Sequence, residues 1–290
     1  MNDAMEGRIV SLRAGIYTVL TQGAVLQCRA RGRFRKDGTT PLVGDMAVVD
    51  DIGSGEGFIT DLLPRKNSLR RPFLANLDQL FMICSVTRPA PNLRMLDTLI
   101  AMAELRDIAP VIVFTKCDLC ACDDFLRIYG AFPHIALSME DNAEDIRGLL
   151  AGKVSAFCGN TGVGKTTLLN KLAPELELPT GEISQKLGRG RHTTRHAELF
   201  PVAGGWVADT PGFGTLEIAD QESLTKENLA LCFREFAPYE GQCRFPDCAH
   251  VKDKGCRILE AVAAGEIPKS RWEGYVSLYE ELKQKNAWIK

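Results

Sequence analysis

The sequence GNTGVGKT at residues 159–166 decides the fold of the middle of this chain. It fits the phosphate-loop pattern GxxxxGK[ST], and it lies between an apolar, strand-like run at 154–158 and a helix-forming run at 168–172, which is the order the motif requires. We expect Lys165 to reach the β- and γ-phosphates and the Thr166 hydroxyl to ligate Mg²⁺. The loop predicts these phosphate-binding residues: Gly159, Asn160, Thr161, Gly162, Val163, Gly164, Lys165, Thr166 and Thr167.

A second motif, DTPG at residues 209–212, follows further along the chain. Asp209 ends an apolar strand-like run, so its carboxylate is expected near the Mg²⁺ ion. The Gly212 amide is expected to sense the γ-phosphate. The pattern DxxG is a weak signal by itself, and it indicates a nucleotide site here because it follows a phosphate loop at the end of a strand-like run.

The tetrapeptide Thr115-Lys116-Cys117-Asp118 selects the base. Asp118 can accept hydrogen bonds from the guanine N1–H and exocyclic amine, while the Lys116 stem packs over the ring. Adenine lacks this donor pair, and a site built on buried polar pairing rejects the wrong ligand by about 10⁴-fold. Thr115 stands where the usual motif has asparagine, and Ser138 is a further candidate near the base. The tetrapeptide therefore indicates GTP rather than ATP.

The order of the three motifs is inverted, because the base-reading tetrapeptide precedes the phosphate loop. A sheet can form from a chain cut and rejoined elsewhere, since domain termini often lie close together at the surface. The inversion predicts a circularly permuted GTPase. In this order the segment after DTPG leads directly into the C-terminal part, which gives a change at the γ-phosphate a short covalent route to it.

The segment GRGRHTTR at 188–195 lies where a mobile switch belongs, between the phosphate loop and DTPG. Thr194 is the expected Mg²⁺ ligand from this segment. Phe213 occupies the place where many regulatory GTPases carry the glutamine that orients the attacking water. His192 is the candidate for that task, with a structural or RNA-contacting role as the alternative.

Four metal-ligand residues lie close together near the C-terminus: Cys243, Cys248, His250 and Cys256. A set of three cysteines and one histidine is a closed tetrahedral zinc site, which is expected to be structural. Unrelated buried side chains are the alternative. The basic neighbours of this set, Arg244, Lys252, Lys254 and Arg257, could contact RNA or could simply be solvated. The pair Cys117 and Cys120 does not predict a second site, because Asp118 between them has another role.

The N-terminal part, residues 7 to about 63, consists of short strand-like runs separated by glycines, which predicts a small barrel or sandwich. Its basic segment RARGRFRK, with Phe34 among the charges, suits an oligonucleotide or a solvated hairpin tip. Strands alternate with helices after a linker at 64–72, and the pattern from about 222 is helical. We therefore expect a parallel sheet covered on both faces, followed by a helical part.

Composition limits the choice of function class. The formal net charge is −2, so any nucleic-acid contact must rest on local patches. The N-terminal sequence has no signal-peptide pattern and no apolar run is long enough to span a membrane. We expect a cytoplasmic protein with reduced cysteines, acting without a membrane and as a monomer.

In these motifs and their order, the chain resembles the ribosome small-subunit-dependent GTPase A (RsgA, or YjeQ/YloQ-type) family of circularly permuted GTPases. The resemblance runs through NSLRRP, PNLRMLD, TKCD, GNTGVGKT, GRGRHTT, DTPGF, the Cys/His set and GEIPKSRWEGY. Thr115, Thr161 and the Thr166-Thr167 pair depart from the commoner pattern, but each keeps a hydroxyl or a small polar group.

The resemblance implies three domains: an OB-fold RNA-binding barrel at 1–68, a permuted GTPase domain at 72–221 and a zinc-binding helical domain at 222–290. It implies binding to the small ribosomal subunit and its rRNA late in maturation, with GTP hydrolysis to GDP and phosphate stimulated by the subunit and coupled to release. A GTP-binding RNA scaffold with little turnover is the alternative that the sequence leaves open.

Overall fold

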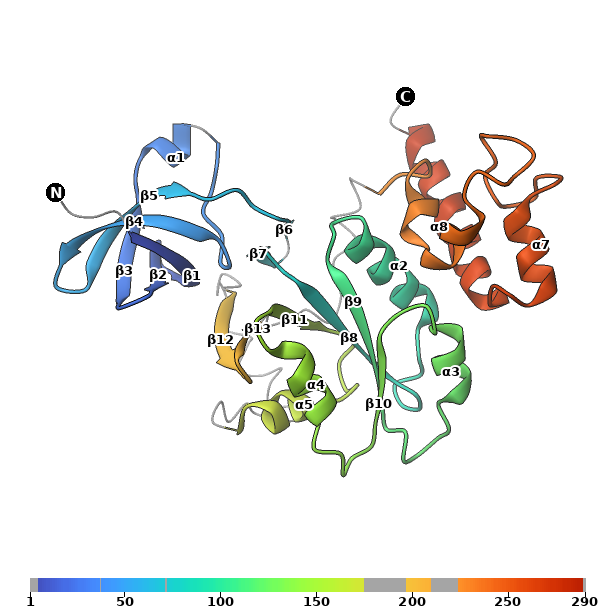
Figure 1. Cartoon of the computed structure of the whole chain (residues 1–290), viewed down its shortest axis with the longest axis horizontal. Coiled ribbons are helices and arrows are strands. Elements are labelled where there is room, and N and C mark those ends of the chain that lie inside the picture. The colour runs from blue at the N-terminus through green and yellow to red at the C-terminus, as the bar shows by residue number, and fades with distance from the viewer. Residues whose placement is uncertain (1–4, 37, 71, 175–196, 210–223, 289–290) are drawn as a thin grey trace.

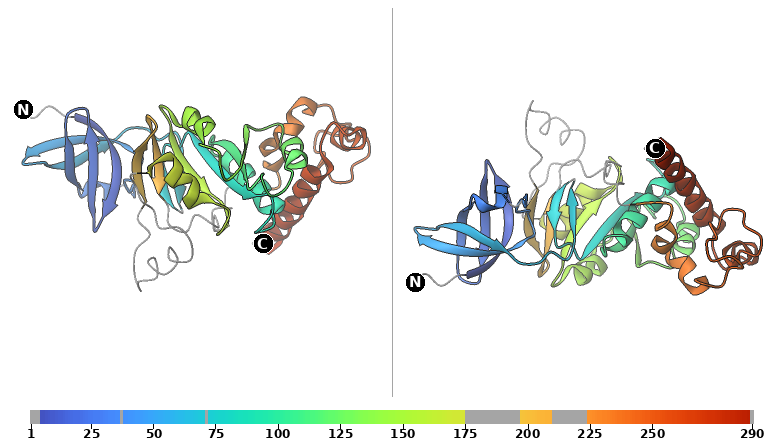
Figure 2. Two further views of the ribbon diagram at one scale, coloured as in Figure 1. Left: turned by 90° about the horizontal axis from the view of Figure 1, so that it is seen from below. Right: turned by 90° about the horizontal axis from the view of Figure 1, so that it is seen from above.

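The computed structural model describes residues 5–36, 38–70, 72–174, 197–209 and 224–288 of the 290-residue chain. Three parts follow one another along the longest axis: a small β-barrel, a central sheet with helices on both faces, and a helical C-terminal part (Figures 1 and 2). This is the expected fold class, which is confirmed.

The barrel contains five strands: β1 (Met5–Arg13), β2 (Ile16–Thr21), β3 (Val25–Ala30), β4 (Met46–Gly53) and β5 (Glu56–Leu62). Their order is β1-β2-β3-β5-β4, and β4 pairs back onto β1, which closes the barrel. Buried and exposed residues alternate along the strands, as a sheet with one face inward requires. The inward side chains include Ile9, Val19, Leu26, Val49 and Ile59.

The basic segment after β3 forms the short helix α1 (Arg33–Lys36). Phe34 is buried in the barrel core, with the Arg33 guanidinium above its ring. It is therefore a core residue and not a surface platform for a base. Arg31 and Arg33 form ion pairs with Asp50 and Asp61, which offset part of the local positive charge.

The central sheet is formed by β8 (Gln79–Ser85), β9 (Ala109–Thr115), β10 (His134–Leu137), β11 (Val154–Cys158), β12 (Glu198–Val202) and β13 (Gly205–Asp209). Its order is β10-β9-β8-β11-β13-β12, and every pair is parallel except β12 with β13. The strand before the phosphate loop, β11, thus lies in the middle of the sheet although it comes fourth in the chain.

Within the described residues, two helices lie on each face of this sheet. The side chains of α2 (Leu93–Glu104) and α3 (Asp123–Ile128) pack with residues such as Ile112 and Phe114 on one face. Those of α4 (Glu144–Leu150) and α5 (Lys165–Leu172) pack with Val111 and Val113 on the other. Successive residues of β9 therefore face opposite layers, which explains why these strands are apolar throughout.

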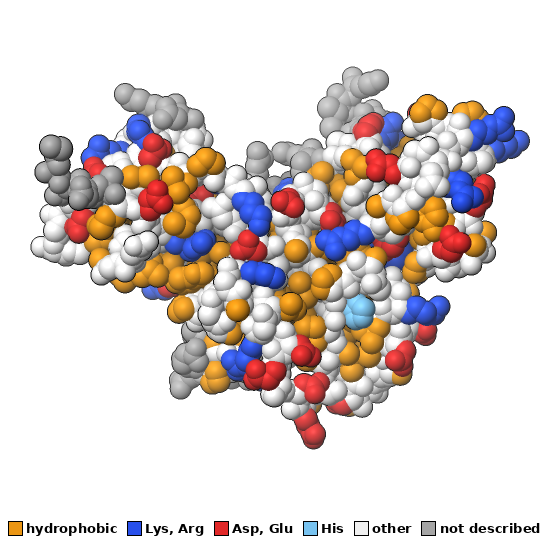
Figure 3. Space-filling view, in the orientation of Figure 1, with side chains coloured by type: hydrophobic (Ala, Val, Ile, Leu, Met, Phe, Trp, Pro, Cys, Tyr) orange, Lys and Arg blue, Asp and Glu red, His pale blue; other side chains and the backbone are white. Residues whose placement is uncertain are grey.

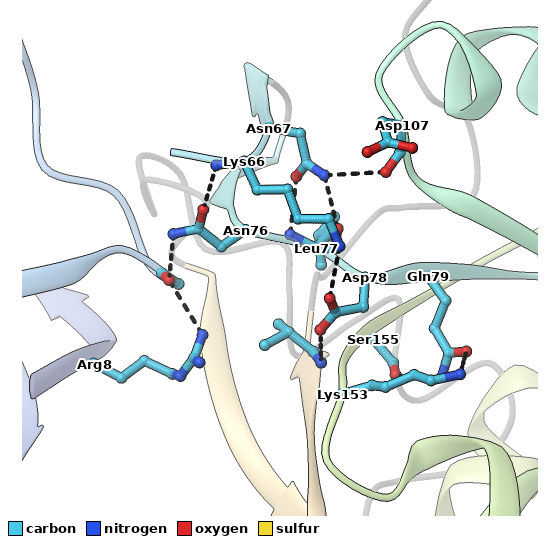
Figure 4. Close-up of polar contacts among 12 residues, drawn as sticks. Arg8, Lys66, Asn67, Asn76, Leu77, Asp78, Gln79, Asp107, Lys153 and Ser155 are labelled. Atoms are coloured by element: carbon cyan, nitrogen blue, oxygen red, sulfur yellow. Dashed lines mark hydrogen bonds and ion pairs between the residues drawn. The ribbon is translucent and has the colours of Figure 1, made fainter. Parts of the chain in front are cut away.

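The barrel joins the central sheet along its edge and through a polar junction. Ser11 of β1 is paired with Glu198 of β12, so the two sheets are continuous. A hairpin of β6 (Ser68–Arg70) and β7 (Phe73–Ala75) bridges the two parts. Beside it, Asn76 donates to Gly44 O, and Asp78 accepts both from Lys66 Nζ and from Val154 N (Figure 4).

The C-terminal part contains the 3₁₀ helices η3 (Leu229–Cys232) and η4 (Arg234–Tyr239) and the helices α7 (Arg257–Ala264) and α8 (Lys269–Trp288). Phe233, Phe236 and Tyr275 form its aromatic core. Helix α8 also packs on α2 of the central part (Figure 1). No described helix is long and apolar enough to cross a membrane. The domain limits 1–68, 72–221 and 222–290 stay a prediction.

Candidate nucleotide site and metal centre

The phosphate loop leaves β11 through three glycines with left-handed backbone conformations. Gly159, Gly162 and Gly164 have φ values of 145°, 82° and 102°. A Cβ atom at Gly159 would lie 2.2 Å from Ile83 O, so only glycine lets this loop turn so close to β8. Helix α5 then begins at Lys165, which directs its free amide groups toward the loop.

Lys165 lies within this loop. Its Nζ donates to Gly159 O at 2.5 Å and to Asn160 O at 2.7 Å. Burial lowers the pKa of Lys165, because desolvation disfavours the ammonium form. Phosphate oxygens carry charge and are stronger acceptors than these carbonyls, so the ammonium is placed to bind an anion held by the loop. Thr166 and Thr167 follow in the first turn of α5.

The base-reading tetrapeptide lies beside the phosphate loop, although 40 or so residues separate them in the chain. Thr115, the last residue of β9, donates from its buried hydroxyl to Val163 O at 2.6 Å. Lys116 Nζ donates to Gly162 O at 3.0 Å and to Arg88 O. These bonds bring the two motifs of the inverted sequence into one site.

Asp118 is held by the loop that follows β10. Its Oδ1 accepts a hydrogen bond from Met139 N at 3.2 Å, and Cys117 N donates to Leu137 O at 3.1 Å. Ser138 therefore lies next to Asp118, as expected for a second residue near the base. The described geometry provides a carboxylate, a lysine stem and a serine loop on one side of the phosphate loop.

Two features of this site are absent from the sequence predictions. The first is the hydrogen bond from the Thr115 hydroxyl to the phosphate loop. The sequence showed only that threonine stands where the usual base-reading motif has asparagine. The second is the 86–92 segment, whose Arg88 carbonyl accepts from Lys116. The resemblance includes PNLRMLD, which begins within this segment, but nothing in the sequence places the Arg88 carbonyl beside Lys116.

Replacing Thr115 with valine tests this contact. The change keeps the side-chain shape but leaves the buried Val163 carbonyl without its donor, which costs about 1–3 kcal/mol. We expect the dissociation constant of GDP to rise about fivefold or more, as measured by titration with a fluorescent GDP analogue. The matched control is Thr60→Val, which removes a barrel hydroxyl bonded to Val48 O. Equal GDP affinity in both variants would contradict this role for Thr115.

The remaining predicted nucleotide residues lie on or beyond β13. The backbone of Asp209 ends this strand, which is parallel to β11 and adjacent to it. Its position is therefore at the same sheet edge as the phosphate loop. His192, Thr194, Gly212 and Phe213 lie outside the described residues, so their roles stay predictions.

The four predicted metal ligands come together in space. The ligand atoms of Cys243, Cys248, His250 and Cys256 all lie within 4.8 Å of one another. His250 Nδ1 is 3.6 Å from Cys243 Sγ and 3.5 Å from Cys256 Sγ. Three sulfurs and one nitrogen arranged in this way can hold a metal ion. Among the described residues, no other set of three or more such side chains is grouped like this. The cysteines at 117–122 therefore form no comparable group.

Helix α8 supports this cluster from behind. Trp272 Nε1 donates to His250 O at 2.9 Å, and the Tyr275 hydroxyl donates to Ala249 O at 2.9 Å. His250 has a φ of 59°, a left-handed conformation that is uncommon for a residue other than glycine. The two hydrogen bonds hold the backbone on either side of the histidine in place, so the cluster is preorganised.

Comparisons with known proteins agree with this geometry. The family model described as "RsgA N-terminal domain" matches residues 6–59, and the one described as "RsgA GTPase" matches residues 62–219. A protein of Caldanaerobacter subterraneus subsp. tengcongensis named "Small ribosomal subunit biogenesis GTPase RsgA" is 41% identical over 291 residues, covering 98% of this chain and 97% of its own. A protein of the same name from Geobacillus sp. is 41% identical, covering 97% and 98%.

Two solved structures share the fold. YloQ, described as a circularly permuted GTPase, superposes with a TM-score of 0.81 at 33% identity, covering 97% of this chain and 96% of its own. YjeQ from Thermotoga maritima superposes with a TM-score of 0.82 at 34% identity, covering 96% and 98%. The family matches, the near full-length relatives and the meeting of the inverted motifs agree, and the chain belongs to the RsgA family of circularly permuted GTPases.

Proposed function

We propose that this GTPase binds and hydrolyses GTP during the late maturation of the small ribosomal subunit, in the cytoplasm and as a monomer. The observation that carries the proposal is the contact between the base-reading tetrapeptide and the phosphate loop through Thr115 and Lys116. The relatives named as small ribosomal subunit biogenesis GTPases support the partner.

The proposed chemistry divides among the residues of the site. Asp118 reads the guanine edge, and Lys165 neutralises charge on the β- and γ-phosphates as the bond to the leaving GDP breaks. Thr166, Asp209 and Thr194 would hold Mg²⁺, which adds positive charge at the transferred phosphate. Gly212 would donate its amide to the γ-phosphate. His192 is proposed to orient the attacking water, since Phe213 cannot do so.

The metal cluster is proposed to bind one structural zinc ion. Three thiolates and one imidazole leave no open position for a substrate or a water. The surroundings support this role, because α8 holds the cluster against the aromatic core of the C-terminal part. Zinc would therefore stabilise this part and would take no step in hydrolysis.

The barrel and the zinc-binding part are proposed to contact ribosomal RNA. Arg29 and Arg31 line one groove of the barrel beside Tyr17 and Thr40. In the C-terminal part the Arg244 guanidinium stacks on Phe245, which is exposed. In both arrangements arginines can contact phosphates while a neighbouring aromatic ring can contact a base. The net charge of the chain is −2, so RNA binding would depend on such local patches.

Co-sedimentation with purified small subunits tests the coupling of hydrolysis to release. We expect the chain to bind the subunits at least tenfold more tightly with a non-hydrolysable GTP analogue than with GDP, because GTPases as a class use contacts to the γ-phosphate to switch between two states. Large ribosomal subunits serve as the matched control particle. Equal retention with both nucleotides would contradict the release step.

A further inference from the structure

Arg271 of α8 is fully buried, and the proposed GTPase chemistry does not use it. Its guanidinium donates to Asp97 of α2 and, at 2.6 Å, to Glu235 of η4. The guanidinium carbon also lies 5.2 Å from the ring centroid of Tyr129 and 4.6 Å from that of Phe233. Arg271 thus contacts Asp97 of α2 and Tyr129, which directly follows α3, in the central part, and also η4 within its own part.

The approach of α8 to α2 requires a glycine. A Cβ atom at Gly274 would lie 2.0 Å from Asp97 Oδ2. Burial raises the pKa of Asp97 to about 6, while Arg271 and the Tyr129 hydroxyl favour its charged form. Both side chains of this ion pair are shielded from solvent, so removing one of them leaves the other buried without its partner, which is strongly destabilising.

One line of contacts runs from Arg271 to the base-reading motif. The Tyr129 hydroxyl donates to Asp97 Oδ1 at 2.9 Å. The ring of Tyr129 packs on that of Phe114, with centroids 6.1 Å apart. Phe114 is fully buried in β9 and directly precedes Thr115. Tyr129 therefore contacts the end of β9, from which the base-reading tetrapeptide begins.

A second line runs through the start of α2. Asn92 caps this helix by accepting from Met95 N, and the segment before it lies against the nucleotide site. Val86 N donates to Thr115 O at 3.1 Å, and Arg88 O accepts from Lys116. Both lines end on the tetrapeptide that reads guanine.

We propose that Arg271 is a positioning residue for guanine recognition, so that the zinc-binding part holds the base-reading tetrapeptide in its binding conformation. The inference rests on the proposed GTP site and extends it, because it makes base selectivity depend on the docking of α8.

The test compares GDP with inosine diphosphate, which lacks the exocyclic amine that Asp118 is expected to bind. We expect Arg271→Leu to lower the preference for GDP over inosine diphosphate at least fivefold. Gly274→Ala keeps every charged group but pushes Asp97 away, and we expect the same direction of change. This ratio is insensitive to the fraction of folded protein, since both ligands are measured on the same sample.

The control variant is Arg94→Ala, which removes the exposed ion pair between α2 and Glu281 of α8; it should leave the preference unchanged. An unchanged preference in Gly274→Ala and in folded Arg271→Leu overturns the inference. If Arg271→Leu does not fold, Gly274→Ala decides. An unaltered chain that does not bind GDP contradicts the proposed function and this inference together, whereas binding with unchanged selectivity in the variants contradicts this inference alone.

Discussion

Replacing Lys165 with alanine is expected to weaken GTP binding about 100-fold, equivalent to about 2.7 kcal/mol. The ammonium lies inside the phosphate loop, hydrogen-bonded to Gly159 O and Asn160 O. Removing this buried cation leaves the negative charge of the bound phosphates without its nearest partner. The loss of binding free energy is largest at such short range and in a low dielectric. Isothermal titration with a non-hydrolysable GTP analogue measures the change.

The matched control is Lys269→Ala, which removes an exposed lysine of α8 paired only on the surface with Glu273. Surface ion pairs contribute little, so this variant should bind GTP as the unaltered chain does. Near-normal turnover in Lys165→Ala would contradict the assignment of this lysine and, with it, the proposed nucleotide site. A pure RNA scaffold, by contrast, would tolerate the change without loss of subunit binding.

Replacing Cys248 with serine is expected to abolish binding of the proposed zinc ion, from about one ion per chain to below about one tenth. The sulfurs and the imidazole nitrogen form a closed set, and a structural site of this kind contributes about 10–16 kcal/mol of apparent binding energy at neutral pH. Loss of the ion should unfold the loops around 243–256 and expose them to protease. Metal analysis and limited proteolysis give the two readouts.

Cys120→Ser is the control for this experiment. Cys120 is an exposed cysteine outside the metal cluster, so its replacement should leave zinc content and protease resistance unchanged. Undiminished zinc in Cys248→Ser would refute the assignment of that ligand. Equal loss of zinc from Cys248→Ser and Cys120→Ser would contradict the assignment of the ion to the cluster of Cys243, Cys248, His250 and Cys256.

The elements and motifs of this fold could be predicted from local sequence. The strand, loop and helix around GNTGVGKT follow from apolar runs and glycines, and the Cys/His spacing predicted a metal cluster that the structure brings together. Barrel closure through β4 and β1 depends on pairing between strands that are distant in the chain. The resemblance, and not the spacing of turns, distinguished a barrel from a sandwich.

The contacts that the sequence did not predict are nonlocal. Arg271 and Asp97 are separated by 174 positions. Helix α8 carries charged residues along its length, and nothing in its sequence shows that its arginine is buried. The Thr115 hydroxyl likewise reaches Val163 across 48 positions. Phe34 illustrates the reverse error, since its basic neighbours indicated a surface residue whereas the barrel buries it.

The inverted motif order suggested that a change at the γ-phosphate reaches the C-terminal part through the chain after DTPG. The described contacts add a route through space, from the base-reading tetrapeptide through α2 to α8. Both proposed routes lead from the nucleotide site to the part of the molecule that carries the Cys/His cluster. Nucleotide state and RNA contact are therefore expected to depend on each other.

Steady-state GTP turnover, measured with and without purified small ribosomal subunits, tests the central claim most directly. In the sequence, Phe213 stands at the position where many GTPases carry the glutamine that orients water, so we expect hydrolysis by the chain alone to be slow. We predict that small subunits raise turnover by about tenfold or more and that large subunits do not. Stimulation of less than about threefold by small subunits would contradict a GTPase controlled by the particle it serves.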